Sequence, residues 1–261
     1  MKDPEITLQS VLTCSEQELA SLVYHSSMKV ISNLLYNSNL TEDLALIIAS
    51  RRNVSPEVLE SLYSNKRWRE SYGIKLALCR NPKAPQRISL ANLKSLRIFD
   101  LADLTRHRQV PMSVRTGAEK QINEKILSMP LGIKISLARR ASSNVLIRLL
   151  EDGMGEVVSV CLDSSFMTEG TLCKIINTKK VASHVIRQIA AHPKWSCRHD
   201  VQWSLLRNNN APLSRVVHFL EHMKTTDLRE LYNDPVVPAS TKPFIYREIS
   251  DRESDEFNST H

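Results

Sequence analysis

The feature that most constrains this chain is a degenerate repeat, in which an apolar helical stretch ends in a short polar turn and a second apolar helix usually follows. The copies span residues 44–62, 74–93, 98–114, 133–150, 157–176, 185–195, 201–220 and 228–249. Seven intervals separate Asn53 from Asn233, so the mean period is about 26 residues, within the range of helical repeat proteins. Single intervals vary, and the register over 181–210 stays open.

The polar turns contain residues that end helices. They carry Asn53, Asn81, His107, His192, Asn208 and Asn233 just past the first helix of each copy. We expect the asparagines to adopt the left-handed backbone conformation that closes a helix. Four prolines follow and suit the first turn of the second helix, where an N–H is not needed: Pro56, Pro85, Pro212 and Pro238.

One such unit is too small to fold alone, because a few buried apolar side chains do not offset the conformational entropy of about 26 ordered residues. Neighbouring units must therefore share a core, as they do in helical solenoids. The pattern predicts an all-α solenoid of about seven to eight short helical pairs. A non-repetitive helical bundle with similar turns is the alternative.

Four segments carry a resemblance to a known family: ALCRNPKAP, IAAHPKWS, LLRNNNAPLSRVVHFL and DLRELYNDPVVP. They resemble the LAxNPxxP units of bacterial HEAT-like repeats and of the leucine-rich repeat variant, over roughly residues 41–248. The resemblance implies a right-handed superhelix of short paired helices and leaves the function open. The variant family also has an N-terminal cysteine cluster that holds an iron–sulfur centre. Only Cys14 lies in the N-terminal segment here, so that feature does not carry over.

The ends of the chain differ from the repeats. Residues 15–37 are expected to form one amphipathic helix with Ser15 as its N-cap and Glu18 completing a capping box. This gives an N-terminal capping region over 1–40 and a solenoid over 41–249. The polar segment 250–261 has almost no apolar side chains and is expected to be a disordered tail.

Composition indicates a soluble cytoplasmic protein. The N-terminus is polar, without the apolar core of a secretory signal, and no apolar run approaches the roughly 20 residues that span a bilayer. The five cysteines are scattered and form no CxxC pair, which is typical of reduced thiols, and no cofactor is expected: Cys14, Cys79, Cys161, Cys173 and Cys197.

An arginine occurs near the end of the first helix in five copies, and these residues are the candidate binding stripe: Arg52, Arg80, Arg106, Arg140 and Arg207. Arg51, Arg108 and Arg139 add to it. Equivalent positions of a solenoid line up along one edge, so the cations could bind an acidic protein surface or the phosphates of a nucleic acid. The alternative is that each arginine only complements the helix dipole at a C-terminus.

Other chemistry has weaker signals. His218 and His222 lie one helical turn apart, and His192, Cys197 and His199 cluster, but neither set has the ligand spacing of a zinc enzyme, so no metal is expected. Trp68, Trp195 and Trp203 could handle a base, as in DNA glycosylases built from HEAT-like repeats, although core packing explains them more simply. Motifs for nucleophilic catalysis, P-loops and dinucleotide binding are missing from the sequence.

These observations lead to one functional prediction and one alternative. The prediction is a non-catalytic scaffold for protein–protein interaction, which uses the concave face or the arginine edge to bind an acidic partner. The alternative is a nucleic-acid-binding protein, for which the net charge of +7 is permissive. The sequence leaves the oligomeric state open.

Overall fold

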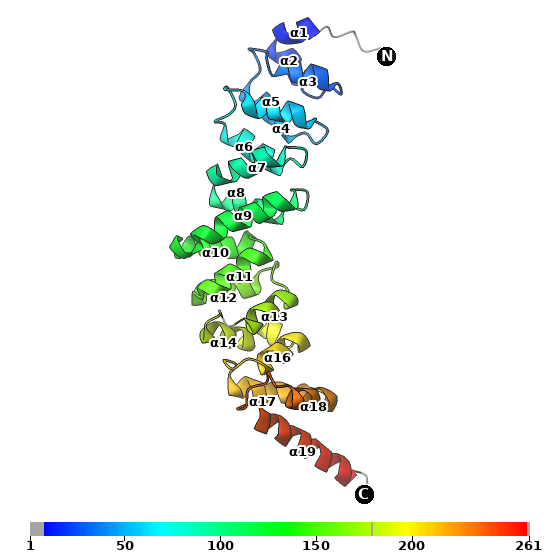
Figure 1. Ribbon diagram of the computed structural model, residues 1–261, viewed down its shortest axis with the longest axis vertical. Coiled ribbons are helices and arrows are strands. Elements are labelled where there is room, and N and C mark those ends of the chain that lie inside the picture. The colour runs from blue at the N-terminus through cyan, green and yellow to red at the C-terminus, as the bar shows by residue number, and fades with distance from the viewer. Residues whose placement is uncertain (1–7, 179, 260–261) are drawn as a thin grey trace. The chain divides into compact units, whose positions relative to one another are not determined.

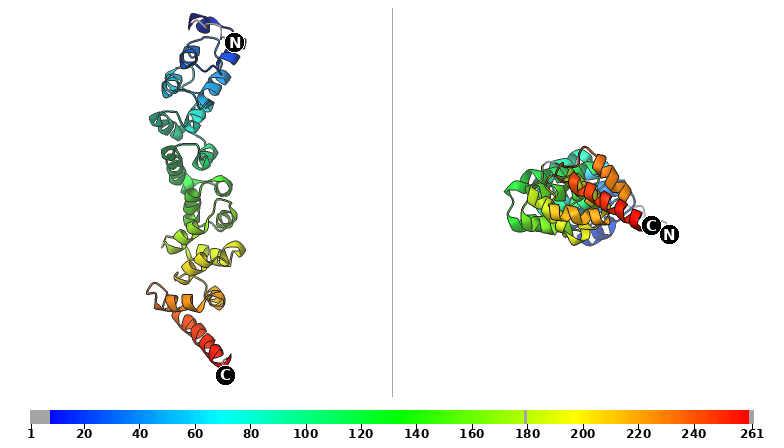
Figure 2. Two further views of the ribbon diagram at one scale, coloured as in Figure 1. Left: turned by 90° about the vertical axis from the view of Figure 1, so that its right-hand side faces the viewer. Right: turned by 90° about the horizontal axis from the view of Figure 1, so that it is seen from below.

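The computed structural model describes residues 8–178 and 180–259, which form helices and connecting turns without a β-strand (Figure 1). The predicted all-α class is confirmed. The chain divides into two compact units, residues 1–125 and 126–261, which we call the N-terminal and C-terminal units. In both units the helices follow one another in pairs (Figure 2).

The N-terminal unit stacks its helices in two columns. In one column α6 packs on α4 and α8 packs on α6, and in the other α1 packs on α3, α3 on α5, and α7 on α9. Its elements are α1 (Leu8–Thr13), α2 (Glu16–Leu22), α3 (Met28–Leu34), α4 (Glu42–Ser50), α5 (Pro56–Ser64), α6 (Tyr72–Arg80), α7 (Gln86–Asn92), the 3₁₀ helix η1 (Leu93–Ser95), α8 (Ile98–Arg106) and α9 (Met112–Lys125).

The C-terminal unit also has two columns, one with α10, α12 and α14 and the other with α11, α13 and α16. Its elements are the 3₁₀ helix η2 (Ile126–Ser128), α10 (Leu131–Arg140), α11 (Ser143–Asp152), α12 (Gly155–Asp163), α13 (Glu169–Asn177), α14 (Ser183–Ala191), α15 (Pro193–Ser196), α16 (His199–Leu206), α17 (Leu213–His222), α18 (Thr225–Asn233) and α19 (Lys242–Ser259).

The register that the sequence left open over 181–210 is now defined. Helix α16 packs mainly on α13, and the Asn208 side chain behind α16 donates to the Ile176 carbonyl of α13. Helix α16 is therefore the second helix of a pair that begins with α14, with the single turn α15 between them. The prediction that 201–220 starts with a first helix is wrong, because the short interval after His192 lies within one pair.

The same turn recurs behind helices of both columns. A polar residue near the helix end accepts a hydrogen bond through its backbone carbonyl from the N–H three residues later, and that later residue packs an apolar side chain inward. The pairs are Asn37 with Leu40, Asn65 with Trp68, Asn81 with Ala84, His107 with Val110, Ser164 with Met167, His192 with Trp195, Asn208 with Ala211, and Asp234 with Val237. The repeat therefore includes turns after second helices, which the sequence pattern did not reveal.

The expected left-handed asparagines are not found: in the described part of the chain, Gly153 alone has a positive φ. Asn81 is extended, with φ −80° and ψ 119°, and its side-chain amide donates to the carbonyls of Ala49 and Arg51 at 2.7 and 2.8 Å. Its side-chain oxygen accepts the N–H of Lys83 at 2.9 Å. The side chain thus satisfies the free carbonyls at the end of α4, so the asparagine joins two layers of the stack.

The same connection repeats along the chain. Amides that donate to carbonyls one layer back come from Asn37 (to Val11 and Cys14), Asn65 (to Leu35) and Asn208 (to Ile176). Three guanidinium groups do likewise: Arg51 donates to Val23 and His25, Arg67 to Asn37, Ser38 and Leu40, and Arg252 to Leu220, Glu221 and Met223. Layers are therefore linked by side-chain donors as well as by apolar packing.

The N-terminal region differs from the single helix expected over 15–37. The capping box of Ser15 and Glu18 is confirmed, but the helix ends at Leu22, and α3 begins at Met28. Arg51 binds the carbonyls of Val23 and His25 between them, which stabilises the break. The apolar side chains of α1–α3 share one core with α4–α7, so this region is part of the N-terminal unit.

The tail predicted to be disordered is helical as far as it is described. Helix α19 runs from Lys242 to Ser259, with Ile245 buried in the core, and residues 260–261 lie outside the described part. Polar contacts hold its second half: Arg252 binds three backbone carbonyls at the C-terminal end of α17, and Arg229 pairs with Glu253 at 2.7 Å. The prediction missed these contacts because it weighed only apolar content.

Candidate functional site

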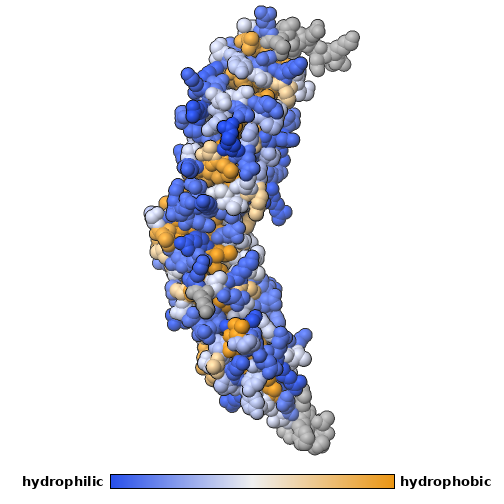
Figure 3. All heavy atoms as spheres, in the orientation of Figure 1, coloured by the Kyte–Doolittle hydropathy of each residue, from blue (hydrophilic) through white to orange (hydrophobic). Residues whose placement is uncertain are grey.

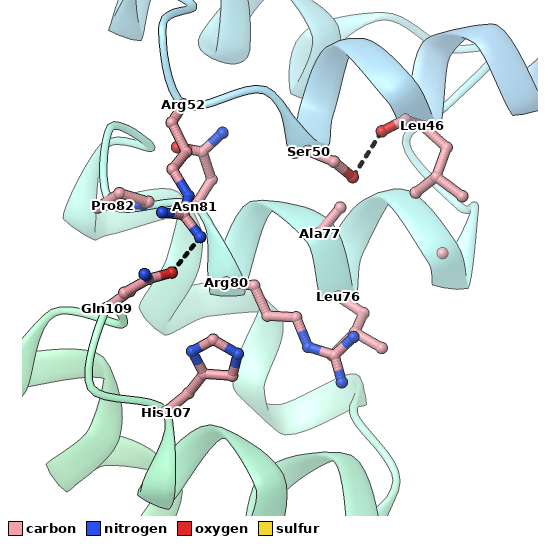
Figure 4. A pocket seen from close by; sticks show the side chains of 11 residues that line it. Leu46, Ser50, Arg52, Leu76, Ala77, Arg80, Asn81, Pro82, His107 and Gln109 are labelled. Carbon is pink, nitrogen blue, oxygen red and sulfur yellow. Dashed lines mark hydrogen bonds between the residues drawn. The ribbon is translucent and has the colours of Figure 1, made fainter.

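Three adjoining hollows form a groove along α4, α6 and α8 of the N-terminal unit. The first hollow, of about 380 Å³, has an apolar floor from Leu46, Leu76 and Ala77, with polar walls that include Arg52 and Arg80 (Figure 4). A second hollow of about 390 Å³ shares Arg80 with it, and a third of about 370 Å³ shares Leu46. We call this surface the arginine groove.

Arg52 lies at one wall of the groove, in the turn between α4 and α5. Its guanidinium donates to the side-chain oxygen of Gln109, as Figure 4 shows, and it makes no ion pair with any residue that the structure describes. A neutral amide does not cancel the charge of a guanidinium. Arg52 therefore leaves a positive charge on the wall, held in place by Gln109.

Arg80 is the last residue of α6 and projects along the groove, with 43% of its side chain exposed (Figure 4). Its nearest carboxylate, Asp100, lies 3.9 Å away and is also the acceptor of the Tyr72 hydroxyl. Burial, and next the hydrogen bond to Asp100, raise the pKa of Tyr72, so this hydroxyl keeps its proton. Because Asp100 is shared and distant, it offsets the Arg80 charge only in part.

Arg106 and His107 extend the groove at the end of α8. Both line the second hollow together with Arg80 and Asp103. Arg106 is the last helical residue and half-buried, and His107 follows as the C-cap. The groove thus gathers Arg52, Arg80 and Arg106, three of the five predicted stripe residues, and Asp103 adds an acidic group beside them.

The remaining two stripe residues lie in the C-terminal unit. Arg140 is the exposed last residue of α10, where its charge complements the helix dipole. Arg207 is the C-cap of α16 and pairs with Asp234 at 2.9 Å. Since α16 is a second helix, the placement of Arg207 on a first helix is corrected. Its ion pair connects α16 to the turn behind α18, which is a structural role.

The tryptophans proposed for base handling belong to different units of the chain. Trp68 is buried in the N-terminal unit, whereas Trp195 is buried in the C-terminal unit and donates its indole N–H to the Leu162 carbonyl at 2.8 Å. Trp203 is half-buried and stacks on His199, with ring centroids 5.9 Å apart. Each ring has a packing role of its own.

In the predicted cluster of His192, Cys197 and His199, the two histidines contact different carboxylates. His192 contacts Asp163 at 3.2 Å, and His199 contacts Asp227 at 3.1 Å and Asp200 at 3.4 Å. The hydrogen bond to Asp227, as the largest cause, raises the pKa of His199. In contrast, His218 and His222 lie close together, and Glu221 lies beside them. The sequence analysis did not include Glu221 in this group, although the segment HFLEH contains all three residues.

All five cysteines are free thiols, and two of them are deeply buried. Burial raises the pKa of both Cys79 and Cys161 to about 12, which leaves almost no thiolate at neutral pH. Brief treatment of the folded protein with iodoacetamide is expected to alkylate the exposed Cys197 and to spare Cys79 and Cys161, as read by peptide mass spectrometry. Equal labelling of all three in the folded state would contradict the burial of these thiols.

The face drawn in Figure 3 is mostly hydrophilic, with apolar side chains in small separate patches. Among the described residues, none of the helices has both the length and the apolar character to cross a membrane. Comparison of the chain with protein-family models, curated proteins and solved structures finds no match.

Proposed function

We propose that the protein is a non-catalytic scaffold whose arginine groove binds an acidic, partly apolar segment of a partner protein. The observation that supports this most is the combination of an apolar floor with walls that carry Arg52 and Arg80, neither of which is fully neutralised. A preformed groove costs little reorganisation on binding, and exposed guanidinium groups suit carboxylates.

A protein partner fits this groove better than a nucleic acid does. The floor offers Leu46, Leu76 and Ala77 to apolar side chains, which a phosphate backbone lacks. Nucleic-acid binding through the same arginines remains the second candidate because the chain has a net charge of +7.

The repeat architecture is part of the proposal. The stacked columns within each unit support an α-solenoid, and the LAxNPxxP-like turns favour a right-handed superhelix of the HEAT-like or leucine-rich-repeat-variant kind. Such scaffolds present extended surfaces on a rigid stack. The cytoplasmic location expected from the sequence belongs to the same proposal.

Charge reversal in the groove tests the binding mode. We expect R52E/R80E to lower affinity for a fluorescent peptide of alternating glutamate and leucine at least about tenfold, because two attractive charges become repulsive. The matched control R69E/R87E makes the same change in charge on exposed arginines that do not line the groove, and it should bind as the wild type does. Fluorescence anisotropy measures the affinity, and circular dichroism checks that each variant is folded.

A photo-crosslinking amino acid at Ser50, an exposed residue of the groove, separates the two candidate partners. In native lysate, a scaffold should yield a protein adduct that resists nuclease and is weakened by R52E/R80E. The same crosslinker at Arg87 is the control position. Adducts that consist of nucleic acid, or equal adducts from both positions, would argue against the proposed groove.

A further inference from the structure

Three potential metal ligands gather on the outer face of α17, far along the chain from the arginine groove. Any two of the ligand atoms of His218, Glu221 and His222 lie within 4.8 Å, and all three side chains are exposed. Positions i, i+3 and i+4 share one face of a helix. The opposite face of α17 is buried through Val216, Phe219 and Leu220, so packing orients the three ligands outward together.

The hydrogen bonding of His222 prepares it as a ligand. Its Nδ1 atom lies 3.0 Å from the carbonyl oxygen of His218. A carbonyl only accepts, so Nδ1 must carry the proton, and the lone pair of the neutral ring is then on Nε2. Histidines that bind metals commonly donate their other N–H to a backbone carbonyl in this way, which fixes both the tautomer and the ring orientation.

The other two ligands are already close to the required arrangement. The rings of His218 and His222 have centroids 4.9 Å apart, and His218 Nδ1 lies 3.5 Å from a carboxylate oxygen of Glu221. A zinc ion needs nitrogen and oxygen ligands at about 2.0–2.2 Å, so its ligand atoms are themselves roughly 3–3.5 Å apart. Small rotations of exposed side chains achieve this spacing.

The backbone beneath the cluster is held in place. Arg252 of α19 donates to the carbonyls of Leu220, Glu221 and Met223, with distances of 2.9, 3.1 and 2.6 Å. These bonds fix the last turn of α17, on which Glu221 and His222 lie. A metal site needs such a supporting shell, because ligands on a fraying helix end would lose their geometry.

We propose that His218, Glu221 and His222 bind one divalent transition-metal ion of the zinc class. Two imidazole nitrogens and one carboxylate oxygen suit this class and select against calcium and magnesium, which prefer oxygen ligands. Three protein ligands leave at least one position of a tetrahedral ion to water or to a side chain of a partner.

Calorimetric titration of the chelator-treated full chain with zinc chloride tests the site. We expect one ion per chain at this cluster and a loss of affinity of at least about tenfold in H218A and in H222A, with a smaller loss in E221Q. The exposed side chains should allow every variant to keep the helical circular dichroism of the wild type. Cobalt substitution gives a second readout, since its visible absorption reports nitrogen ligation.

There are three matched controls, each a single variant. H107A removes an exposed histidine of the other unit, and C197S and H199A remove the thiol and the imidazole that lie nearest to the cluster in the sequence. These controls should bind zinc as the wild type does. Zinc affinity unchanged in H218A and H222A would overturn the proposal, and so would affinity that disappears in C197S or H199A while it persists in H222A.

Discussion

Replacing Lys134 with methionine is expected to destabilise the C-terminal unit by about 3–5 kcal/mol. Lys134 of α10 donates to Asp152, the last residue of α11, at 2.7 Å, and only 4% and 9% of the two side chains are exposed. Without the ammonium group, the Asp152 carboxylate stays buried without its cation. Asp152 also lies at a helix C-terminus, where the helix dipole disfavours an anion. The ammonium group of Lys134 therefore offsets both the burial of the carboxylate and its repulsion by the dipole.

Hydrogen exchange in peptides from α10 and α11 measures this loss locally. Because about 1.4 kcal/mol corresponds to a factor of ten, the slowest amides of these helices should exchange about two to four orders of magnitude faster in K134M. A matched control is K75M, which removes an ion pair whose partner Glu70 is 85% exposed and should cost less than about 1 kcal/mol. A stability loss in K134M as small as that in K75M would contradict the burial of the Lys134–Asp152 ion pair.

The double variant K134M/D152L separates the charge from the packing. A buried ion pair replaced by apolar side chains of similar size is often neutral or stabilising. We therefore expect the double variant to recover most of the stability lost in K134M. A double variant as unstable as K134M would mean that the loss comes from changed packing of the lysine stem.

The sequence was sufficient for the helical class and for most helix ends, because these depend on local chemistry. Apolar periodicity identified the helices, the Ser15 capping box is present, and Pro56 begins α5 as expected. The turns at Asn81, His107 and His192 do follow first helices. Each of these features is determined by residues within one or two helical turns.

The features that were missed depend on neighbours distant in sequence. An asparagine that follows a helix can cap that helix or donate a hydrogen bond to another layer of the stack. Only the structure shows that the Asn81 side chain donates to another layer, to the carbonyls of Ala49 and Arg51. The column of α16 depends on its packing against α13. The gathering of Arg52 and Arg80 at one groove was predictable from the repeat, whereas the neutralisation of Arg207 by Asp234 was not.

Replacing Asn81 with alanine is expected to cost about 2–4 kcal/mol, because buried acceptors that lose their donors keep their full desolvation penalty. Asn81 is 3% exposed, and its amide serves the carbonyls of Ala49 and Arg51. The matched control is N53A, since Asn53 is exposed and contacts the Arg51 side chain at the surface. Urea unfolding followed by circular dichroism should show a change of less than about 0.5 kcal/mol for N53A.

The isosteric variant N81D identifies which half of the side chain matters. Aspartate keeps an oxygen for the N–H of Lys83, which preserves the local turn, but it replaces the amide donor with a second oxygen facing two carbonyls. If the link between layers is the main contribution, N81D should be at least as unstable as N81A. If the local turn is the main contribution, N81D should be close to the wild type, and the side-chain links at Asn37, Asn65 and Asn208 would lose their assigned role in joining the layers.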